Sequence, residues 1–433
     1  MRISAALLAL LAFTGCALYS DVSVSPLYLS PTDIERGSDV QSMLRKADYL
    51  RAMEAAPAID ARQKKNAADL AAVGTAFLAA GRFDDARVRL RAALDLEPFR
   101  TTYAAIAWDL AQVEYMSNNY EASLEWANIA REHGLNIRQW HIDYLKSLQN
   151  MPVYEFSGES TARVPFRFGR PDVPRITASV NGSEIEAILD SGAVLSIISE
   201  RLAASISIRS LGTYEGTFYG LLGEPIQVHF GMVDTLKIGD MTITNVPVAI
   251  MPDDKMRFLI NKKDGQQFNM DLLLGTNLLK EFRIELDFDR RRLTLKALTP
   301  ADRRPDPDQN LFFEGFRPYV RGAINRKGWY LFVLDTGSEI TFLNETRLRT
   351  LPVQSLLGTH SAMLQGLGGT MKRGSKIEDV EIGLDRWGGK FKTLPMYASA
   401  DKEHAVGIIG QNFLKNFNVV IDFGRMKLEL ARR

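Results

Sequence analysis

The chain has 433 residues, of which 46% are hydrophobic and 24% are charged. These proportions are ordinary for a globular protein, and the length predicts about three domains. The formal net charge of +1 gives no electrostatic basis for a nucleic-acid partner, so none is expected. The single cysteine, Cys16, excludes an intrachain disulfide.

The N-terminus has the pattern of an export signal. Arg2 precedes an apolar run over 3–13, which is followed by the small residues of Thr14-Gly15-Cys16-Ala17. Such a run is too short to span a membrane as a mature helix. The junction is similar to a bacterial lipoprotein processing site, which implies a signal peptide over 1–15 and lipid on Cys16. A plain secretory signal is the alternative, and both export the protein.

The resemblance to a lipoprotein processing site also indicates where the protein is anchored and predicts a tether after Cys16. Ala17, after the cysteine, resembles the outer-membrane sorting pattern. We therefore expect anchoring at the periplasmic face of the outer membrane, if the host has one, with a tether over 16–37. No other run approaches the ~18 apolar residues that a spanning helix needs.

The segment over 38–150 is predicted to be a helical domain, because it is rich in Ala, Leu, Arg and Glu with helical periodicity. Its small and apolar residues follow the spacing of one tetratricopeptide repeat, and a looser repeat begins near Ala107. Flanking helices are expected near 40–53 and 137–148. A generic helical bundle is the alternative. Tetratricopeptide-like repeats bind peptides or proteins along a concave face, so this domain could hold a partner or pack on the rest of the chain. The residues that fit the first repeat are Leu70, Gly74, Phe77, Gly81, Phe83, Ala86, Leu90, Ala93 and Pro98.

Twice, an apolar strand runs into an Asp-Ser-Gly or Asp-Thr-Gly tripeptide. The two aspartates, Asp190 and Asp335, lie 145 residues apart. Each is preceded by two predicted strands and a tight turn. The predicted strands are 176–180 and 185–189 around the turn 181–182, and 319–324 and 329–334 around the turn 325–328. A lone tripeptide of this kind is an ordinary polar turn. A functional role for the two aspartates is therefore predicted only because the motif and its surroundings are repeated.

Two further segments repeat in the same order. Leu273-Leu274-Gly275-Thr276-Asn277 matches Ile408-Ile409-Gly410-Gln411-Asn412 at an offset of 135 residues, which leaves the first copy with ten extra residues near 261–267. Glycine clusters, 219–223 and 365–369, follow the two aspartates at 30 and 31 residues, counted to the first glycine. Glycines at a hairpin tip allow the backbone to approach a ligand, whereas two unrelated glycine turns are the alternative.

This order of features resembles the retropepsin-like aspartic protease family, in two tandem copies over 163–430. The resemblance implies an α plus all-β architecture, in which the helical repeats precede two acid-protease β-barrel lobes related by a pseudo-twofold axis. We place the lobes at 151–299 and 311–433. The proline-rich, charged linker 300–310 is expected to be exposed and semi-extended. Leu222 stands where the second glycine cluster has Gly368, so the two flaps are not alike.

The resemblance also implies a mechanism. Asp190 and Asp335 would share one proton, as aspartic protease dyads do, and would activate a water as general base and general acid. No metal or cofactor is expected, since the five histidines lack metal-ligand spacing. The residues expected to support the dyad are Ser191 and Thr336, whose hydroxyls would lock the two loops together, and Gly192 and Gly337, whose N–H groups would reach the carboxylates.

A polypeptide substrate is expected to bind in the cleft between the lobes as an added strand, covered by flaps. The candidate flap residues are Tyr219, Gly220, Leu221, Gly223, Gly366, Leu367, Gly368 and Gly369. Because both halves of the site belong to one chain, we expect a monomer.

The sequence therefore predicts an exported, lipid-anchored aspartic endopeptidase. Two alternatives remain. The same fold could hold peptides without turnover, or the helical domain could act as a scaffold. Both aspartates and both following Ser/Thr-Gly pairs are intact, which favours the enzyme.

Overall fold

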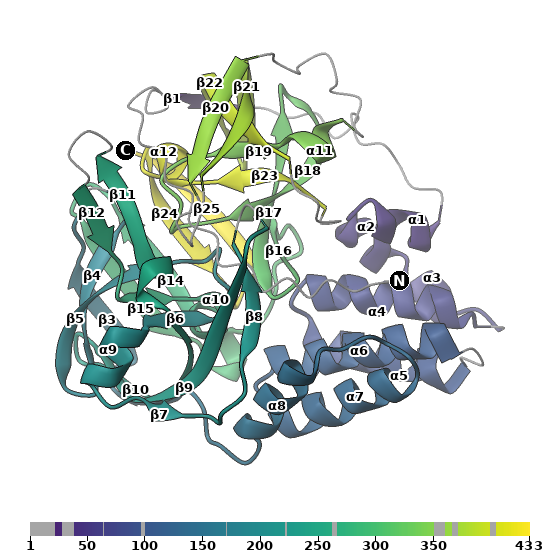
Figure 1. Ribbon diagram of the computed structural model, residues 1–433. Helices are drawn as coiled ribbons and strands as arrows, with labels where there is room; N and C mark the ends of the chain where they lie inside the picture. The colour runs from purple at the N-terminus through teal and green to yellow at the C-terminus, as the bar shows by residue number, and fades with distance from the viewer. Residues whose placement is uncertain are drawn as a thin grey trace.

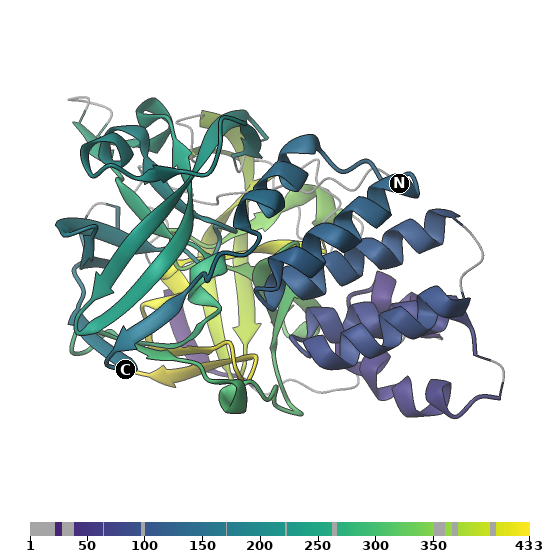
Figure 2. The same cartoon turned by 90° about the horizontal axis from the view of Figure 1, so that it is seen from below.

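The computed structural model describes residues 22–27, 39–63, 65–96, 100–169, 171–220, 223–261, 266–349, 360–365, 371–398 and 404–433. A helical domain lies to one side of two β-rich lobes (Figure 1). Figure 2 shows the same division from below, with the purple and blue helices beside the lobes. The predicted signal peptide and Cys16 lie outside the described residues.

The helical domain consists of helices that follow one another along the chain. They are α1 (Val40–Arg45), α2 (Tyr49–Glu54), α3 (Ala56–Asp60), α4 (Ala67–Ala79), α5 (Phe83–Leu96), α6 (Arg100–Met116), α7 (Tyr120–Glu132) and α8 (Gln139–Leu148). The helix expected near 40–53 is interrupted, because Ala47 has a positive φ of 55° between α1 and α2. Gly74 lets α4 approach α5 closely, since a Cβ there would lie 2.7 Å from the Leu90 side chain.

The helical domain packs on the second lobe through aromatic residues. The ring centroids of Tyr49 and Phe312 are 5.6 Å apart, and those of Tyr115 and Phe316 are 4.9 Å apart. Phe312 is buried in the same apolar cluster as residues of α4 and α6. The helices therefore use part of their surface to pack against the second β-rich lobe.

The first lobe begins after α8 and is built from antiparallel hairpins. Its elements are β2 (Glu155–Gly158), β3 (Thr161–Pro165), β4 (Arg175–Val180), β5 (Ser183–Leu189), β6 (Ser196–Ser199), α9 (Glu200–Ser205), β7 (Arg209–Ser210), β8 (Gly216–Tyr219), β9 (Pro225–Ile238), β10 (Met241–Met251), the 3₁₀ helix η3 (Asp253–Met256), β11 (Arg257–Asn261), β12 (Gln266–Asn269), β13 (Leu272–Leu274), α10 (Thr276–Leu279), β14 (Phe282–Asp287) and β15 (Arg292–Ala297). The predicted turn between β4 and β5 is confirmed: Asn181 and Gly182 both have positive φ, at 48° and 86°.

The second lobe repeats this plan after the 3₁₀ helix η4 (Pro300–Asp302). Its elements are β16 (Leu311–Glu314), β17 (Arg317–Ile324), β18 (Lys327–Leu334), β19 (Phe342–Asn344), α11 (Glu345–Leu348), β20 (His360–Gln365), β21 (Met371–Leu384), β22 (Trp387–Tyr397), β23 (Ala405–Ile409), α12 (Gln411–Leu414), β24 (Phe417–Asp422) and β25 (Lys427–Arg432). The turn before β18 is only Asn325-Arg326, shorter than the predicted 325–328. The N-terminal strand β1 (Val22–Pro26) pairs with β22.

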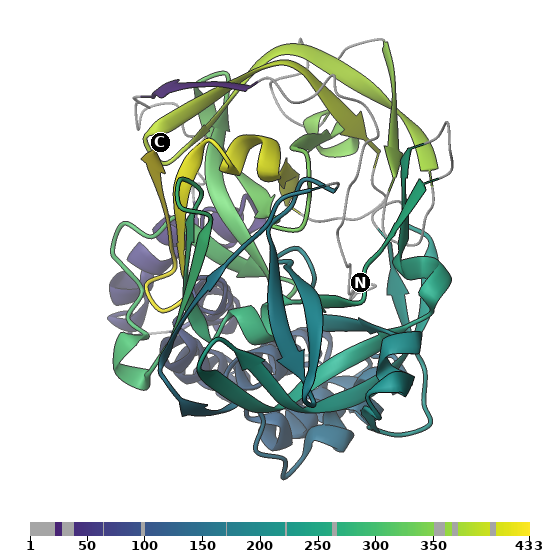
Figure 3. The same ribbon diagram turned by 90° about the vertical axis from the view of Figure 1, so that its left-hand side faces the viewer.

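A shared sheet joins the lobes. Its strand order is β25-β24-β14-β15-β3, so β24 and β25 of the second lobe continue the first-lobe strands, and β14 pairs antiparallel with β24. Figure 3 shows the second lobe, green to yellow, above the teal first lobe. In each lobe the strand before the Gly-x-Asn helix runs parallel to the strand that ends at the aspartate: β13 beside β5, and β23 beside β18.

The linker between the lobes is not exposed along its whole length, so that expectation is wrong at its end. Gln309 and Asn310 are buried, at 1% and 8% exposure. The Asn310 side chain donates to the Leu428 carbonyl at 2.9 Å and accepts from the Leu428 N–H at 2.7 Å. Because an amide side chain can replace a backbone partner at a strand, this polar residue is held inside the fold.

No helix within the described ranges is long and apolar enough to cross a membrane.

Candidate active site

The two parallel strand pairs deliver the two aspartates. The backbone N–H of Asp190, just after β5, donates to the Leu274 carbonyl of β13 at 2.9 Å. The N–H of Asp335, just after β18, donates to the Ile409 carbonyl of β23 at 3.1 Å. Both aspartates are fully buried. The equivalent pairing in each lobe therefore fixes both aspartates in the same backbone setting.

Four hydrogen bonds connect the two aspartate loops. The Ser191 hydroxyl donates to the Leu334 carbonyl at 2.6 Å, and the Thr336 hydroxyl donates to the Leu189 carbonyl at 2.7 Å. Each hydroxyl also accepts a backbone N–H from the other loop, at 3.0 Å from Thr336 and 3.1 Å from Ser191. Each hydroxyl thus donates one hydrogen bond and accepts one across the pseudo-twofold axis. These bonds make the two loops a single rigid unit.

Backbone N–H groups hold the outer oxygen of each carboxyl group. Asp190 Oδ1 accepts from Gly192 and Ala193 N–H groups, both at 3.0 Å. Asp335 Oδ1 accepts from the Gly337 N–H at 2.9 Å. A Cβ at Gly192 would lie 2.5 Å from Asp335 Oδ2, so only glycine lets the two loops come this close.

The remaining oxygens, Oδ2 of Asp190 and Oδ2 of Asp335, accept no N–H group of the described residues, and the two carboxyl groups interact with each other through a side-chain hydrogen bond. Burial raises the pKa of Asp190 to about 7, against the opposing effect of the backbone N–H groups. Burial, and then the charge of Asp190, raises the pKa of Asp335 well above its usual range. Two buried carboxyl groups this close do not both ionise easily, so the pair retains a proton near neutral pH.

The short helices after β13 and β23 support the loops from behind. The Thr276 hydroxyl of α10 donates to the Ser191 carbonyl at 2.9 Å, and the Gln411 amide of α12 donates to the Thr336 carbonyl at 2.7 Å. These two positions match each other in the sequence, but no role was predicted for them. The repetition of a hydrogen-bonding residue between Gly and Asn was the available signal.

The Gly-x-Asn motif has a physical explanation in this packing. Asn277 Oδ1 accepts from the Ser196 N–H, and Asn412 Oδ1 accepts from the Thr341 N–H, each at 2.7 Å. A Cβ at Gly275 would lie 2.4 Å from the Leu195 carbonyl oxygen. Gly275 therefore lets its backbone approach Leu195 closely. The asparagine in each lobe accepts a hydrogen bond from the segment that follows the aspartate and so holds that segment in place.

The first glycine cluster lies at the tip of a hairpin. Strands β8 and β9 pair from Gly216 to Tyr219, opposite 225–228. At the tip the Gly220 N–H donates to the Glu224 carbonyl at 2.9 Å, and Gly223 has a positive φ of 82°. Leu221 at this tip, and Gly366, Leu367, Gly368 and Gly369 between β20 and β21, lie outside the described residues.

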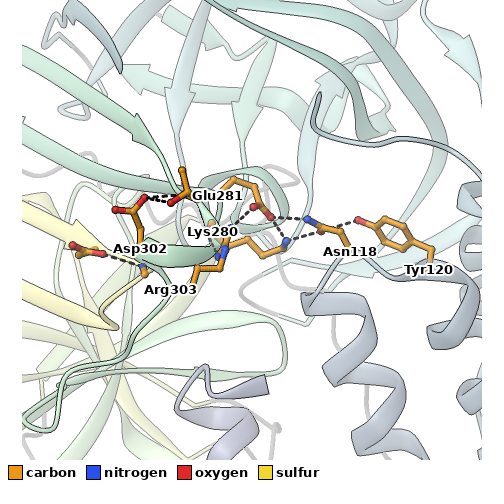
Figure 4. A network of polar contacts seen from close by, with 9 residues as sticks. Asn118, Tyr120, Lys280, Glu281, Asp302 and Arg303 are labelled. Atoms are coloured by element: carbon orange, nitrogen blue, oxygen red, sulfur yellow. Dashed lines mark hydrogen bonds and ion pairs between the residues drawn. The ribbon is translucent and has the colours of Figure 1, made fainter. Parts of the chain in front are cut away.

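A polar network that sequence analysis did not predict joins the helical domain to the end of α10 (Figure 4). Lys280 Nζ donates to Asn118 Oδ1 at 2.6 Å, and the Asn118 amide donates to Glu281 at 2.9 Å. Glu281 is also paired with Lys280 and with Arg303 of the linker. Although burial opposes the effect, Lys280 and Arg303 lower the pKa of Glu281. Three parts of the chain, the α6–α7 turn, the end of α10 and the linker, are thereby held together.

Metal binding has no evident site in the part of the chain that the structure describes. No group of three or more His, Cys, Asp or Glu side chains there is placed to hold an ion.

Comparison with known proteins agrees with this geometry. Residues 176–278, which include Asp190 and end within α10, match the family model described as aspartyl protease. Among solved structures, a retropepsin-like aspartic protease from Rickettsia conorii is 19% identical, covering 33% of this chain and 95% of that chain, with a TM-score of 0.21. No curated protein sequence matches the chain.

Proposed function

We propose that this protein is an aspartic endopeptidase whose dyad is Asp190 and Asp335. The observation that carries the proposal is the set of reciprocal Ser191 and Thr336 hydrogen bonds, which hold two buried carboxyl groups together. Two neighbouring carboxyl groups that share one proton can act on a bound water as general base and general acid.

The mechanism follows from one proton shared by two carboxyl groups. The ionised carboxylate takes a proton from the water as its oxygen attacks the peptide carbonyl carbon, and the protonated partner donates its proton to the carbonyl oxygen. The tetrahedral intermediate collapses when the carbonyl reforms, the C–N bond breaks and the leaving nitrogen receives a proton from the dyad. The raised pKa values of both aspartates support a dyad that keeps its proton at neutral pH.

The substrate is proposed to be a polypeptide bound in an extended conformation between the lobes. The β8–β9 hairpin, with Tyr219, Gly220 and Gly223 at its tip, supplies one of the covering flaps. The loop-to-loop hydrogen bonds all lie within one chain, which supports an active monomer. A further protein partner on the helical repeats would have to use surface that the second lobe leaves free.

We also propose that the protein is exported and lipid-anchored through Cys16, at the periplasmic face of the outer membrane. Strand β1 begins six residues after this cysteine and is paired with β22, so the anchor would lie close to the second lobe. Mass spectrometry of the membrane fraction tests this: a diacylglyceryl-sized or larger addition on Cys16 is expected. A soluble protein with an unmodified N-terminus beyond Cys16 would refute it.

Incubation with a peptide library tests the proposed activity. The wild type should cleave, while Asp190→Asn and Asp335→Asn should each lose roughly 10³-fold in turnover and retain the fold. Peptide binding without cleavage by the wild type would favour the alternative, a silent binding protein of the same fold. Near-wild-type turnover in either variant would refute the dyad.

A further inference from the structure

The last helix of the helical domain, α8, lies directly against the first flap. The Trp140 ring stacks on Phe230 of β9 with centroids 5.7 Å apart, and Tyr144 contacts the same ring at 4.9 Å. Trp140 also lies 6.1 Å from Phe218 of β8. All of these rings are buried. Figure 1 shows α8 beside β8 and β9.

A second contact lies next to the flap tip. Arg138, the residue before α8, donates to the Tyr219 hydroxyl at 2.9 Å. Its guanidinium carbon is 5.1 Å from the centroid of the Tyr219 ring. Tyr219 is the last residue of β8 and precedes Gly220 of the tip. One arginine thus holds both the hydroxyl and the ring face of a flap residue, and each of these interactions is attractive in its own right.

A third contact holds the start of the same hairpin. Tyr214, just before β8, stacks on Phe230 at 5.4 Å, and its hydroxyl lies 2.8 Å from the Ser147 hydroxyl of α8. A Cβ at Gly216 would lie 2.6 Å from the Phe230 ring and 3.3 Å from Trp140. Helix α8 therefore contacts the hairpin from its start to its tip. At Gly216 the packing is so close that only glycine fits.

The second-lobe hairpin has the same backbone plan. Strand β21 pairs with β20, β22 and β17, just as β9 pairs with β8, β10 and β4. The contacts with α8 are therefore an addition to this shared plan at the first hairpin.

We propose that Arg138 is a positioning residue for the first flap, so that the helical domain fixes Tyr219 in place for peptide binding. This inference rests on the proposed protease function. Ordering a flap costs free energy that a substrate must otherwise supply when it binds. With the flap already ordered, a larger fraction of the protein is competent to bind substrate. The apparent affinity for substrate rises in proportion to that fraction. Loss of Arg138 should therefore raise KM more than it lowers kcat.

The kinetic experiment uses the full chain in detergent and a peptide that the wild type cleaves. Arg138→Ala should raise KM about tenfold, which corresponds to about 1.4 kcal/mol, with kcat changed less than about threefold. Arg138→Lys should recover part of the loss, since lysine can also donate to Tyr219. Adding Tyr219→Phe to Arg138→Ala should cost little more, because the two residues act through one contact. Lys146→Ala, which removes an exposed cation from the same helix, is the matched control and should behave as wild type.

Hydrogen exchange provides a readout that does not depend on activity. In Arg138→Ala the amides of 216–228 should exchange several-fold faster, whereas those of the β4–β5 hairpin should not change. Unchanged exchange at 216–228, or an unchanged KM in Arg138→Ala, would overturn the inference while leaving the dyad proposal intact. The same KM increase in Lys146→Ala would also overturn it. A wild type without turnover would instead refute the proposed function, and hydrogen exchange would still decide whether Arg138 holds the flap.

Discussion

Replacing Asp190 by asparagine should make the protein more stable at neutral pH. The pKa of this buried carboxyl group rises from 3.8 to about 7 on folding. The folded chain therefore holds the proton more tightly than the unfolded chain. The contribution of Asp190 to stability is fully present below pH 3.8 and is lost progressively as the pH rises through about 7. That difference in pKa corresponds to about 4 kcal/mol, the order of the penalty that an asparagine would relieve at pH 8.

The assay is thermal unfolding of wild type and Asp190→Asn at several pH values between 4 and 8. The unfolding temperature of the variant should exceed that of the wild type by several degrees at pH 8, and this difference should shrink toward pH 4. Since the dyad titrates as a pair, Asp335→Asn should give a similar profile. Glu184→Gln, on the exposed part of β5, is the matched control and should unfold at a temperature close to that of the wild type. An unfolding temperature of the wild type at pH 8 that equals or exceeds that of Asp190→Asn would refute the reasoning.

Three further substitutions test the parts around the dyad. Gly192→Ala should lower turnover about 100-fold, because its Cβ would displace the Asp335 carboxyl group, and activity within threefold of wild type would contradict that packing. Thr336→Val should lower the free energy of unfolding by about 2 to 4 kcal/mol, measured by urea denaturation, whereas Thr336→Ser keeps both hydrogen bonds and should cost far less. Lys280→Met should cost about 3 kcal/mol because it leaves Glu281 buried with fewer partners. Equal midpoints for Lys280→Met and wild type would show that the network in Figure 4 contributes nothing to stability.

Local signals allowed much of the lobe architecture to be predicted from the sequence. Asn181-Gly182 specifies a two-residue turn because both positions need a positive φ, and the structure has this turn. The second turn was predicted two residues too long. Gly328 indicated a turn, but it lies within β18 with a φ of 66°, at the register shift of that hairpin. A glycine alone does not distinguish a turn from an irregular strand.

Contacts between segments far apart in the chain could not be predicted. Gln411 supports a loop 75 residues earlier, and Arg138 reaches a flap residue 81 residues later in another domain. Neither contact leaves a periodic or local pattern. The burial of Asn310 was missed for a similar reason, since its partner in β25 lies 118 residues away. The linear motif around each aspartate was visible, whereas the residues that hold it in place became visible only in three dimensions.

The most direct test of the central claim is single-turnover peptide cleavage in water enriched in oxygen-18, with the new C-terminus analysed by mass spectrometry. Direct attack by a water held between Asp190 and Asp335 predicts one heavy oxygen in that carboxylate, no covalent acyl-enzyme on the chain, and cleavage by Asp335→Asn that is slower by roughly 10³-fold. Cleavage by Asp335→Asn at the wild-type rate, or a trapped acyl-enzyme, would contradict the account.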